Sequence, residues 1–113
     1  MINFKNKKIY GWSKSSYSRC NYLETSKVEQ ITDVFDYAKK NNNKISLRGG
    51  GRSYGDNTLN KNNIVLKHVA EKNIHSFNEL NGEILVSGSC TLIELLKFTI
   101  PKGWILNVSP ASQ

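Results

Sequence analysis

Four glycines that directly follow a short apolar segment constrain this chain more than any other feature. They fall within positions 49–55, half of the eight glycines in the sequence, and the segment before them, 44–47, is long enough for a strand. Glycine lets the backbone adopt positive φ and lets a ligand approach the main chain, so several amide N–H groups of such a loop can point toward one anion. A pyrophosphate is the ligand that this arrangement suits. The plain alternative is that the glycines only form a tight connection.

Two common phosphate-binding motifs do not fit this loop. The Walker motif G-x-x-x-x-G-K-[ST] is excluded because Gly51 and Gly55 are too close together and neither Lys-Ser nor Lys-Thr follows them. The dinucleotide motif G-x-G-x-x-G, starting at Gly49, needs a glycine at the position of Tyr54. An anion site here therefore relies on the amides and side chains of the loop itself.

Polar side chains inside the loop add hydrogen-bond donors and positive charge. Ser53 and Asn57 can donate hydrogen bonds from their side chains. Arg48 and Arg52 carry positive charge. Either arginine could instead be a solvated flank of the loop or a structural partner of Asp56.

Residues 27–41 form the most clearly patterned element, an amphipathic helix. Its apolar residues recur at the three-and-four spacing of one helical face and are Val28, Ile31, Val34, Phe35 and Ala38. Ser26 as N-cap, with Glu29 three positions later, predicts a capping box, and the asparagine run at 41–43 predicts the end of the helix. The local order is therefore helix, strand and glycine loop.

Short strands are expected in the second half of the chain. The apolar segments 64–66 and 104–106 predict two of them. A hairpin is predicted from 74–77 and 83–87, which flank an Asn-Gly dipeptide at 81–82 that is favoured in tight turns.

A second helix is predicted after Thr91. This residue is the expected N-cap, Glu94 is its capping-box partner, and Pro101 stops the helix. The apolar residues of this helix are Leu92, Leu95, Leu96 and Phe98. Helices and strands in this order predict an α+β fold with mixed strand directions.

Residues 1–19 lack a clear period, so we expect an extended lead-in before a domain that comprises 20–113. Three aromatic residues of the lead-in are expected to pack on a neighbouring surface: Tyr10, Trp12 and Tyr17. The sequence stops after an apolar segment without a closing helix. We therefore expect it to be the first portion of a larger domain, incomplete at the C-terminus.

The chain is basic, with a formal net charge of +7 and a pI of about 9.5. This charge suits an anionic partner such as nucleic acid, a phosphate-bearing cofactor or an acidic membrane surface. Lysine and asparagine make up 27 of the 113 residues, and only Lys5, Lys7 and Lys8 form a local group. We therefore expect no nucleic-acid partner, and keep a small basic nucleic-acid-binding module, whose aromatic residues stack on bases, as the alternative function.

Cysteines and apolar runs exclude several classes of protein. Cys20 and Cys90 have no CxxC pair or His/Cys cluster near them, so we expect two free, buried thiols and no metal site. No apolar run approaches the roughly 20 residues of a membrane-spanning helix, and the N-terminus lacks the apolar stretch of a secretory signal. The sequence therefore predicts a cytoplasmic location.

Residues 48–57, with the helix and strand before them, resemble the start of the FAD-binding domain of vanillyl-alcohol-oxidase or p-cresol-methylhydroxylase (PCMH) type flavoenzymes. Within that superfamily the string GRSYGDN at 51–57 is most similar to the bacterial decaprenylphosphoryl-ribose 2'-oxidase group and to related sugar and alditol oxidoreductases. The pattern can be followed over almost the whole chain from Gly11 onward.

The resemblance implies two α+β subdomains with FAD between them, the first with a small parallel sheet and the second with antiparallel strands. This chain would supply the first subdomain and the start of the second. The loop would wrap the FAD pyrophosphate with its amides, and Ala111 would add a contact where the family has a Pro-Gly-Thr-like segment. The cofactor-binding residues that the resemblance implies are Leu47, Arg48, Gly49, Gly50, Gly51, Arg52, Ser53, Tyr54, Gly55, Asp56, Asn57 and Ala111.

Many members of this superfamily attach FAD covalently through a histidine of this loop, at the place where this chain has Arg52. Arginine cannot form that bond, so we expect non-covalent FAD. His68 and His75, the only histidines, lie outside the loop and are expected to be structural or surface residues.

The activity that the resemblance implies is that of an FAD-dependent oxidoreductase acting on a CH–OH group of a sugar or polyol. In such enzymes the catalytic groups and the sugar or polyol site lie in the C-terminal part, so no catalytic residue is assigned and the fragment alone is expected to be inactive. Members that act on lipid-linked sugars can associate with a membrane surface through other parts of the protein. A non-catalytic truncated remnant is a further alternative.

Overall fold

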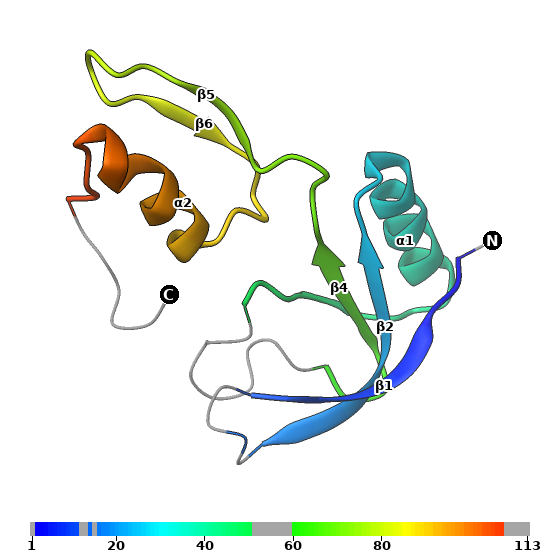
Figure 1. Cartoon of the computed structure of the whole chain (residues 1–113). Helices are drawn as coiled ribbons and strands as arrows, with labels where there is room; N and C mark the ends of the chain where they lie inside the picture. The colour runs from blue at the N-terminus through cyan, green and yellow to red at the C-terminus, as the bar shows by residue number, and fades with distance from the viewer. Residues whose placement is uncertain (1, 12–13, 15, 51–59, 108–113) are drawn as a thin grey trace. The chain divides into compact units, whose positions relative to one another are not determined.

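The computed structural model describes residues 2–11, 14, 16–50 and 60–107. Its elements follow one another in the order β1 Lys5–Tyr10, β2 Tyr17–Thr25, α1 Val28–Lys40, β3 Ile45–Leu47, β4 Ile64–His68, β5 Ile74–Phe77, β6 Ile84–Val86, α2 Leu92–Thr99 and the short 3-10 helix η1 Ile100–Lys102 (Figure 1). They form two compact units, Met1–Val69 and Ala70–Gln113. The expected α+β class with mixed strand directions is confirmed.

The first unit is built on a four-stranded sheet in the order β1-β2-β4-β3 (Figure 1). β1 runs antiparallel to β2, whereas β2, β4 and β3 are parallel, with Ile64 of β4 between Asn21 of β2 and Ile45 of β3. The run Ile-Val-Leu at 64–66 is buried on both faces of β4. Such a continuous apolar run is typical of a central parallel strand, and the strand predicted here is confirmed.

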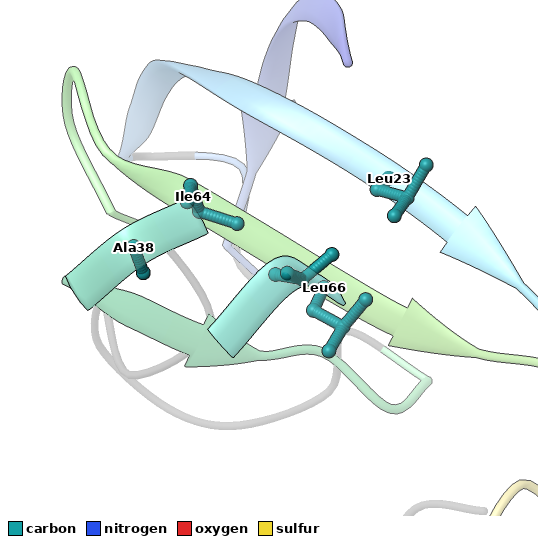
Figure 2. Packing of buried hydrophobic residues seen from close by; sticks show 5 residues of the cluster. Leu23, Ala38, Ile64 and Leu66 are labelled. Carbon is teal, nitrogen blue, oxygen red and sulfur yellow. The ribbon is translucent and has the colours of Figure 1, made fainter. Parts of the chain in front are cut away.

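Helix α1 packs on one face of this sheet and forms the main core with it. Figure 2 labels four members of this core, which are Leu23 of β2, Ile64 and Leu66 of β4, and Ala38 of the helix. Val34, which has no exposed surface, is the fifth member of this core. The removal of these apolar side chains from water is the main force that holds the helix on the sheet.

The opposite face of the sheet carries a smaller core. Successive strand residues point to opposite faces, so Val65 lies on the face away from Ile64. There it packs with Ile9, Cys20 and Tyr22. Both faces of the sheet are therefore apolar near its centre.

The buried face of α1 is narrower than the helical periodicity predicts. Val34 and Ala38 are buried and Ile31 is half-buried, whereas Val28 and Phe35 are 68% and 52% exposed. At about 100° per residue, Val28 and Phe35 lie at one edge of the apolar stripe. The sheet covers the opposite edge of the stripe, at Val34 and Ala38, and leaves this edge exposed.

The capping box expected at Ser26 and Glu29 is wrong. The N-cap is Lys27, which makes no side-chain capping hydrogen bond within the described residues. Thr25 Oγ1 instead accepts a hydrogen bond from Lys27 N at 3.0 Å, and it donates one to Gln30 Oε1. The last residue of β2 therefore holds the first turn of the helix.

The end of α1 and the strand after it agree with the sequence pattern. Asn41 is the C-cap, and Asn42 adopts a left-handed φ of 53°, which asparagine tolerates better than most residues. β3 then begins at Ile45. The order helix, strand and glycine loop is confirmed.

The lead-in expected over 1–19 is in fact a paired strand and the start of another. β1 pairs with β2 along its whole length, from Lys5 opposite Tyr22 to Tyr10 opposite Tyr17. β1 is an edge strand with three exposed lysines, so it lacks the alternation of apolar and polar residues that marks a half-buried strand. This is why the sequence pattern did not indicate the hairpin.

The second unit contains the expected hairpin and helix. β5 and β6 are antiparallel, and Gly82 between them has a φ of 78°, which favours glycine. α2 begins with the predicted capping box, in which Thr91 Oγ1 accepts from Glu94 N at 3.3 Å and Glu94 Oε2 accepts from Thr91 N at 3.1 Å. The helix ends before Pro101, which lies in η1.

The strand expected at 104–106 is absent from the described structure, because the side chain of Trp104 packs on the hairpin turn. Trp104 Nε1 donates to the carbonyl O of Glu79 at 3.0 Å. Its ring lies so close to Gly82 that a Cβ there would stand 2.6 Å from it. The tryptophan is thus held by its side chain and does not extend the sheet with its backbone.

Candidate functional site

The glycine loop leaves the sheet at the carboxyl end of β3. Arg48 N donates to the carbonyl O of Leu66 at 3.0 Å, which continues the pairing of β3 with β4 by one residue. Leu47 is 67% exposed, and Gly49 and Gly50 are exposed as well. Ligands of open parallel sheets bind outside the carboxyl ends of the strands, so the loop begins where such a site is expected.

Arg48 connects the start of the loop to the N-terminal hairpin. Its Nη2 donates to the carbonyl O of Tyr10 at 2.9 Å, and the side chain is half-buried. The sequence left two alternatives for this arginine: it could be a solvated residue that flanks the loop, or it could pair with Asp56. Asp56 lies outside the described residues. The contact with Tyr10 is a role that the sequence did not suggest.

Gly49 has room for a side chain within the described structure. A Cβ at this position would have no described atom within 4 Å, and its φ is outside the left-handed region. Among the described residues, neither packing nor backbone conformation therefore requires glycine here. The missing side chain leaves the amide open to close approach, which fits the recognition of a pyrophosphate by main-chain N–H groups.

The loop returns to the sheet through an asparagine-rich turn. Asn60 Nδ2 donates to the carbonyl O atoms of Lys44 and Ile64, both at 3.0 Å. Asn63 Oδ1 accepts a hydrogen bond from Lys44 N at 2.9 Å, and Asn62 adopts a φ of 59°. These contacts tie the start of β3 to the start of β4, so both ends of the glycine loop have fixed places in the sheet.

The positioning role of these asparagines was missed in the sequence. The general abundance of asparagine in this chain obscured it. The available signal was an Asn-x-Asn-Asn pattern at 60–63 directly before an apolar strand, since asparagine side chains bond to nearby backbone and tolerate left-handed φ.

The positive charge of Arg48 acts to lower the pKa of two buried groups, the Cys20 thiol and the Tyr22 phenol. Burial raises the pKa of the Cys20 thiol above its usual value, while the charges of Arg48 and Lys7 act to lower it. Burial also raises the pKa of the Tyr22 phenol, and Glu24 acts in the same direction. Both groups are therefore uncharged at neutral pH, and neither is an activated nucleophile.

Both cysteines are free, but only Cys20 is buried as expected. Cys90 is half-buried. Burial raises the pKa of its thiol, and the nearby carboxylate of Glu94 raises it further. This thiol is also uncharged at neutral pH.

The two histidines make hydrogen bonds within their own units. His68 Nδ1 lies 3.1 Å from the carbonyl O of Thr25, so the ring donates to it. His75 Nε2 lies 2.7 Å from Ser87 Oγ, which gives its own proton to the carbonyl O of Lys72. Ser87 therefore accepts from His75. Both contacts are of the kind that structural histidines make.

An open groove of about 460 Å³ lies on the second unit. Its lining residues come from β5, the segments around it, the end of α2 and η1, and they are Lys72, Ile74, His75, Ser76, Phe77, Glu79, Phe98 and Lys102. The rings of Phe77 and Phe98 meet edge to face with centroids 5.5 Å apart. These aromatic residues have the sequence pattern of a strand and a helix core, so no sequence pattern indicated the groove.

The structure brings four of the expected cofactor-binding residues together at the end of β3: Leu47, Arg48, Gly49 and Gly50. The others, 51–57 and Ala111, lie outside the described residues. Within the described ranges, no group of three or more His, Cys, Asp or Glu side chains could hold a metal ion. None of the helices in these ranges is long and apolar enough to span a bilayer.

Comparison with known proteins identifies the family of this chain. Residues 21–113 match the family model of an FAD-binding domain. The chain is 30% identical over 108 residues, or 95% of its length, to the decaprenylphosphoryl-β-D-ribose oxidase of Mycolicibacterium smegmatis. It spans only 24% of the length of that relative. Because the family model covers most of its residues, the chain belongs to the FAD-binding domain family, and FAD is its cofactor.

Proposed function

We propose that this chain forms the first part of the cofactor site of a flavin-dependent oxidoreductase that oxidises a hydroxyl group of a sugar or polyol. The observation that carries this proposal is its similarity, over 108 residues, to a protein named as an oxidase of a ribose derivative. The open space around Gly49, just after the carboxyl end of β3, supports the part of the proposal that concerns FAD. The chain spans 24% of that relative, so the proposal places the substrate site in the rest of the protein.

In this proposal the loop holds the FAD pyrophosphate by its main-chain amides. The open amide of Gly49 approaches the phosphate oxygens, and the guanidinium of Arg48 adds positive charge nearby. Residues 51–57 continue this contact, and Ala111 adds a second one. The side chains that contribute are Ser53, Asp56 and Asn57. Bound FAD supplies the two-electron acceptor for oxidation of the alcohol, while the protein supplies orientation and electrostatics.

The test uses the protein that carries this chain, purified with its FAD. Anaerobic addition of sugar or polyol alcohols, ribose derivatives among them, is expected to bleach the absorbance of the oxidised flavin. The matched control is the same compound with the candidate hydroxyl replaced by hydrogen. If the protein retains FAD and no sugar or polyol bleaches it, the proposed oxidation is wrong and the membership in the FAD-binding family still stands.

The flavin is expected to be held without a covalent bond. Arg52 stands where many related flavoenzymes have a linking histidine, and a guanidinium cannot form that link. Acid precipitation of the flavin-loaded protein should therefore leave the yellow colour in the supernatant. Colour that stays with the washed pellet would contradict this expectation without affecting the proposed oxidation.

A further inference from the structure

The cations of this chain are concentrated at its N-terminal end. Residues 1–23 contain five cations and no acidic residue, and they contribute +5 of the formal net charge of +7. These cations are Lys5, Lys7, Lys8, Lys14 and Arg19. The first acidic residue of the chain is Glu24.

The fold places most of this charge on one exposed hairpin. The three lysines of the edge strand β1 are exposed. β4 pairs with β2 only over 21–25, so residues 17–20 of β2 have β1 as their strand partner. We call the exposed part of this hairpin the basic hairpin surface, and it consists of Lys5, Lys7, Lys8, Tyr10, Tyr17 and Arg19.

Two tyrosines of this surface lie beside its lysines. Tyr10 and Tyr17 are directly opposite one another, with ring centroids 5.9 Å apart, and they are 42% and 60% exposed. Lys8 Nζ lies 3.9 Å from the ring centroid of Tyr17 and 5.5 Å from that of Tyr10. The hairpin therefore presents aromatic rings and ammonium groups side by side.

The positive charge of this surface is not balanced by carboxylates of the described chain. Lys8 and Arg19 are directly opposite in the strand register, a pairing of like charges that is unfavourable by itself. Arg19 Nη1 contacts the neutral amide oxygen of Asn6 at 3.5 Å. The ion pair of the described residues, Lys67 with Glu24, lies outside this surface. An anionic partner would relieve this repulsion.

We propose that the basic hairpin surface binds an anionic lipid bilayer as a peripheral contact, a property beyond the proposed oxidoreductase function and independent of it. Tyrosine is enriched at the level of lipid headgroups, and each lysine or arginine near an anionic leaflet strengthens attachment. Long lysine side chains let both faces of an edge strand reach the same charged plane.

A nucleic acid fits this surface less well than a bilayer. Binding of single strands depends on open aromatic faces on which bases stack. One face of the most exposed ring, that of Tyr17, is occupied by the ammonium group of Lys8. Fewer ring faces are therefore open for stacking, while the charge of the surface remains available to phosphate headgroups.

The experiment measures sedimentation of the full protein with lipid vesicles. Wild-type protein should bind vesicles of phosphatidylglycerol mixed with phosphatidylcholine, and it should not bind phosphatidylcholine alone. The variant Lys7→Gln/Lys8→Gln should bind about 30-fold more weakly, because each basic residue near the surface contributes roughly a fivefold factor. The matched control is Lys39→Gln/Lys40→Gln, which removes the same charge from exposed positions in the last turn of α1.

Three outcomes would overturn the proposal. The first is that the wild-type protein does not bind the anionic vesicles, and the second is that both double variants lose vesicle binding equally. The third is that the protein binds a single-stranded oligonucleotide tightly but does not bind vesicles. A salt titration of the wild-type protein provides a readout that needs no variant, since attachment by exposed charges should weaken steadily as the Debye length falls. Binding that persists unchanged at about 1 M salt would contradict an electrostatic contact.

Discussion

Gly82 and Gly49 lack side chains for different reasons. Gly82 has a φ of 78°, and the ring of Trp104 occupies the space of a Cβ. Among the described residues Gly49 has neither constraint, and it lies at the start of the loop that we propose for the FAD pyrophosphate. Gly82 is therefore required by the fold, whereas the proposed reason for glycine at position 49 is its contact with the cofactor.

Alanine substitutions should separate these two roles. We expect Gly82→Ala to lower the free energy of unfolding by about 1–3 kcal/mol, because it combines a left-handed backbone with a steric clash. Gly49→Ala should leave stability within about 0.5 kcal/mol and weaken FAD binding. Urea denaturation and flavin titration of the full protein measure the two effects. Gly88→Ala, at another open glycine, is the control, and equal FAD affinity of the Gly49 and Gly88 variants would exclude close approach at Gly49.

The buried thiol of Cys20 should make stability depend on pH in the alkaline range. Burial raises its pKa above the usual 9.0, so the folded state holds the proton more tightly than the unfolded state. The resulting stabilisation is complete below the unfolded-state pKa and is lost as the pH rises through the folded-state pKa. Urea denaturation at about pH 7 and about pH 10 should show a smaller decrease in Cys20→Ala than in wild type. Equal decreases would assign the pH dependence to other groups.

The two helices of this chain begin in different ways although both follow the same sequence rule. Ser26 with Glu29 and Thr91 with Glu94 have the capping-box spacing, but only the second pair forms the box. Before α1, β2 continues to Thr25, whose hydroxyl already accepts a hydrogen bond from the backbone N of the N-cap residue Lys27. The preceding strand thus decides which of two adjacent hydroxyl residues meets the helix.

This difference predicts unequal effects of removing the two hydroxyls. Thr91→Ala should lower the free energy of unfolding by about 1 kcal/mol, because it leaves an amide of α2 without its partner. Ser26→Ala should change it by less than about 0.5 kcal/mol, since Ser26 is exposed and does not cap α1. Circular dichroism during urea denaturation gives both changes in the free energy of unfolding. A loss of stability in Ser26→Ala as large as that in Thr91→Ala would show that Ser26 caps α1 after all.

For the whole molecule, structural elements that depend on residues close in sequence could be predicted, whereas contacts between residues far apart in sequence could not. The helices, β3, β4 and the β5–β6 hairpin follow from periodicity and turn residues. β1 is stabilised by pairing with β2, and its lysines do not mark it as a strand. The contact of Arg48 with Tyr10 joins residues 38 positions apart, which no local pattern indicates.

The position of the loop after a strand could be predicted because glycine content and strand order are local features, whereas its contact with a phosphate-bearing cofactor stays a prediction. The expected cofactor-binding residues at 51–57 and Ala111 stay predictions, since they lie outside the described residues. The asparagine turn that holds the far end of the loop depends on contacts with Lys44, which directly precedes β3 and is distant in sequence.

The 113 residues alone are expected to bind FAD weakly. A cofactor held between two subdomains loses part of its contacts when the partner surface is incomplete, and this chain spans 24% of its relative. Titration of the 113-residue chain, followed by quenching of flavin fluorescence, should give a Kd weaker than about 1 μM. A submicromolar Kd would show that these residues hold FAD by themselves.

The place of β4 in the sheet determines the order in which the first unit can assemble. β4 lies between β2 and β3 although it follows both along the chain. The β1–β2 hairpin joins residues close in sequence and can form within microseconds. β2 and β3 do not pair with each other, so they join one sheet only after β4 has paired with both. As the chain leaves the ribosome, hairpin and helix therefore emerge first. Two strand edges then stay unpaired until residues 64–68 are inserted between them.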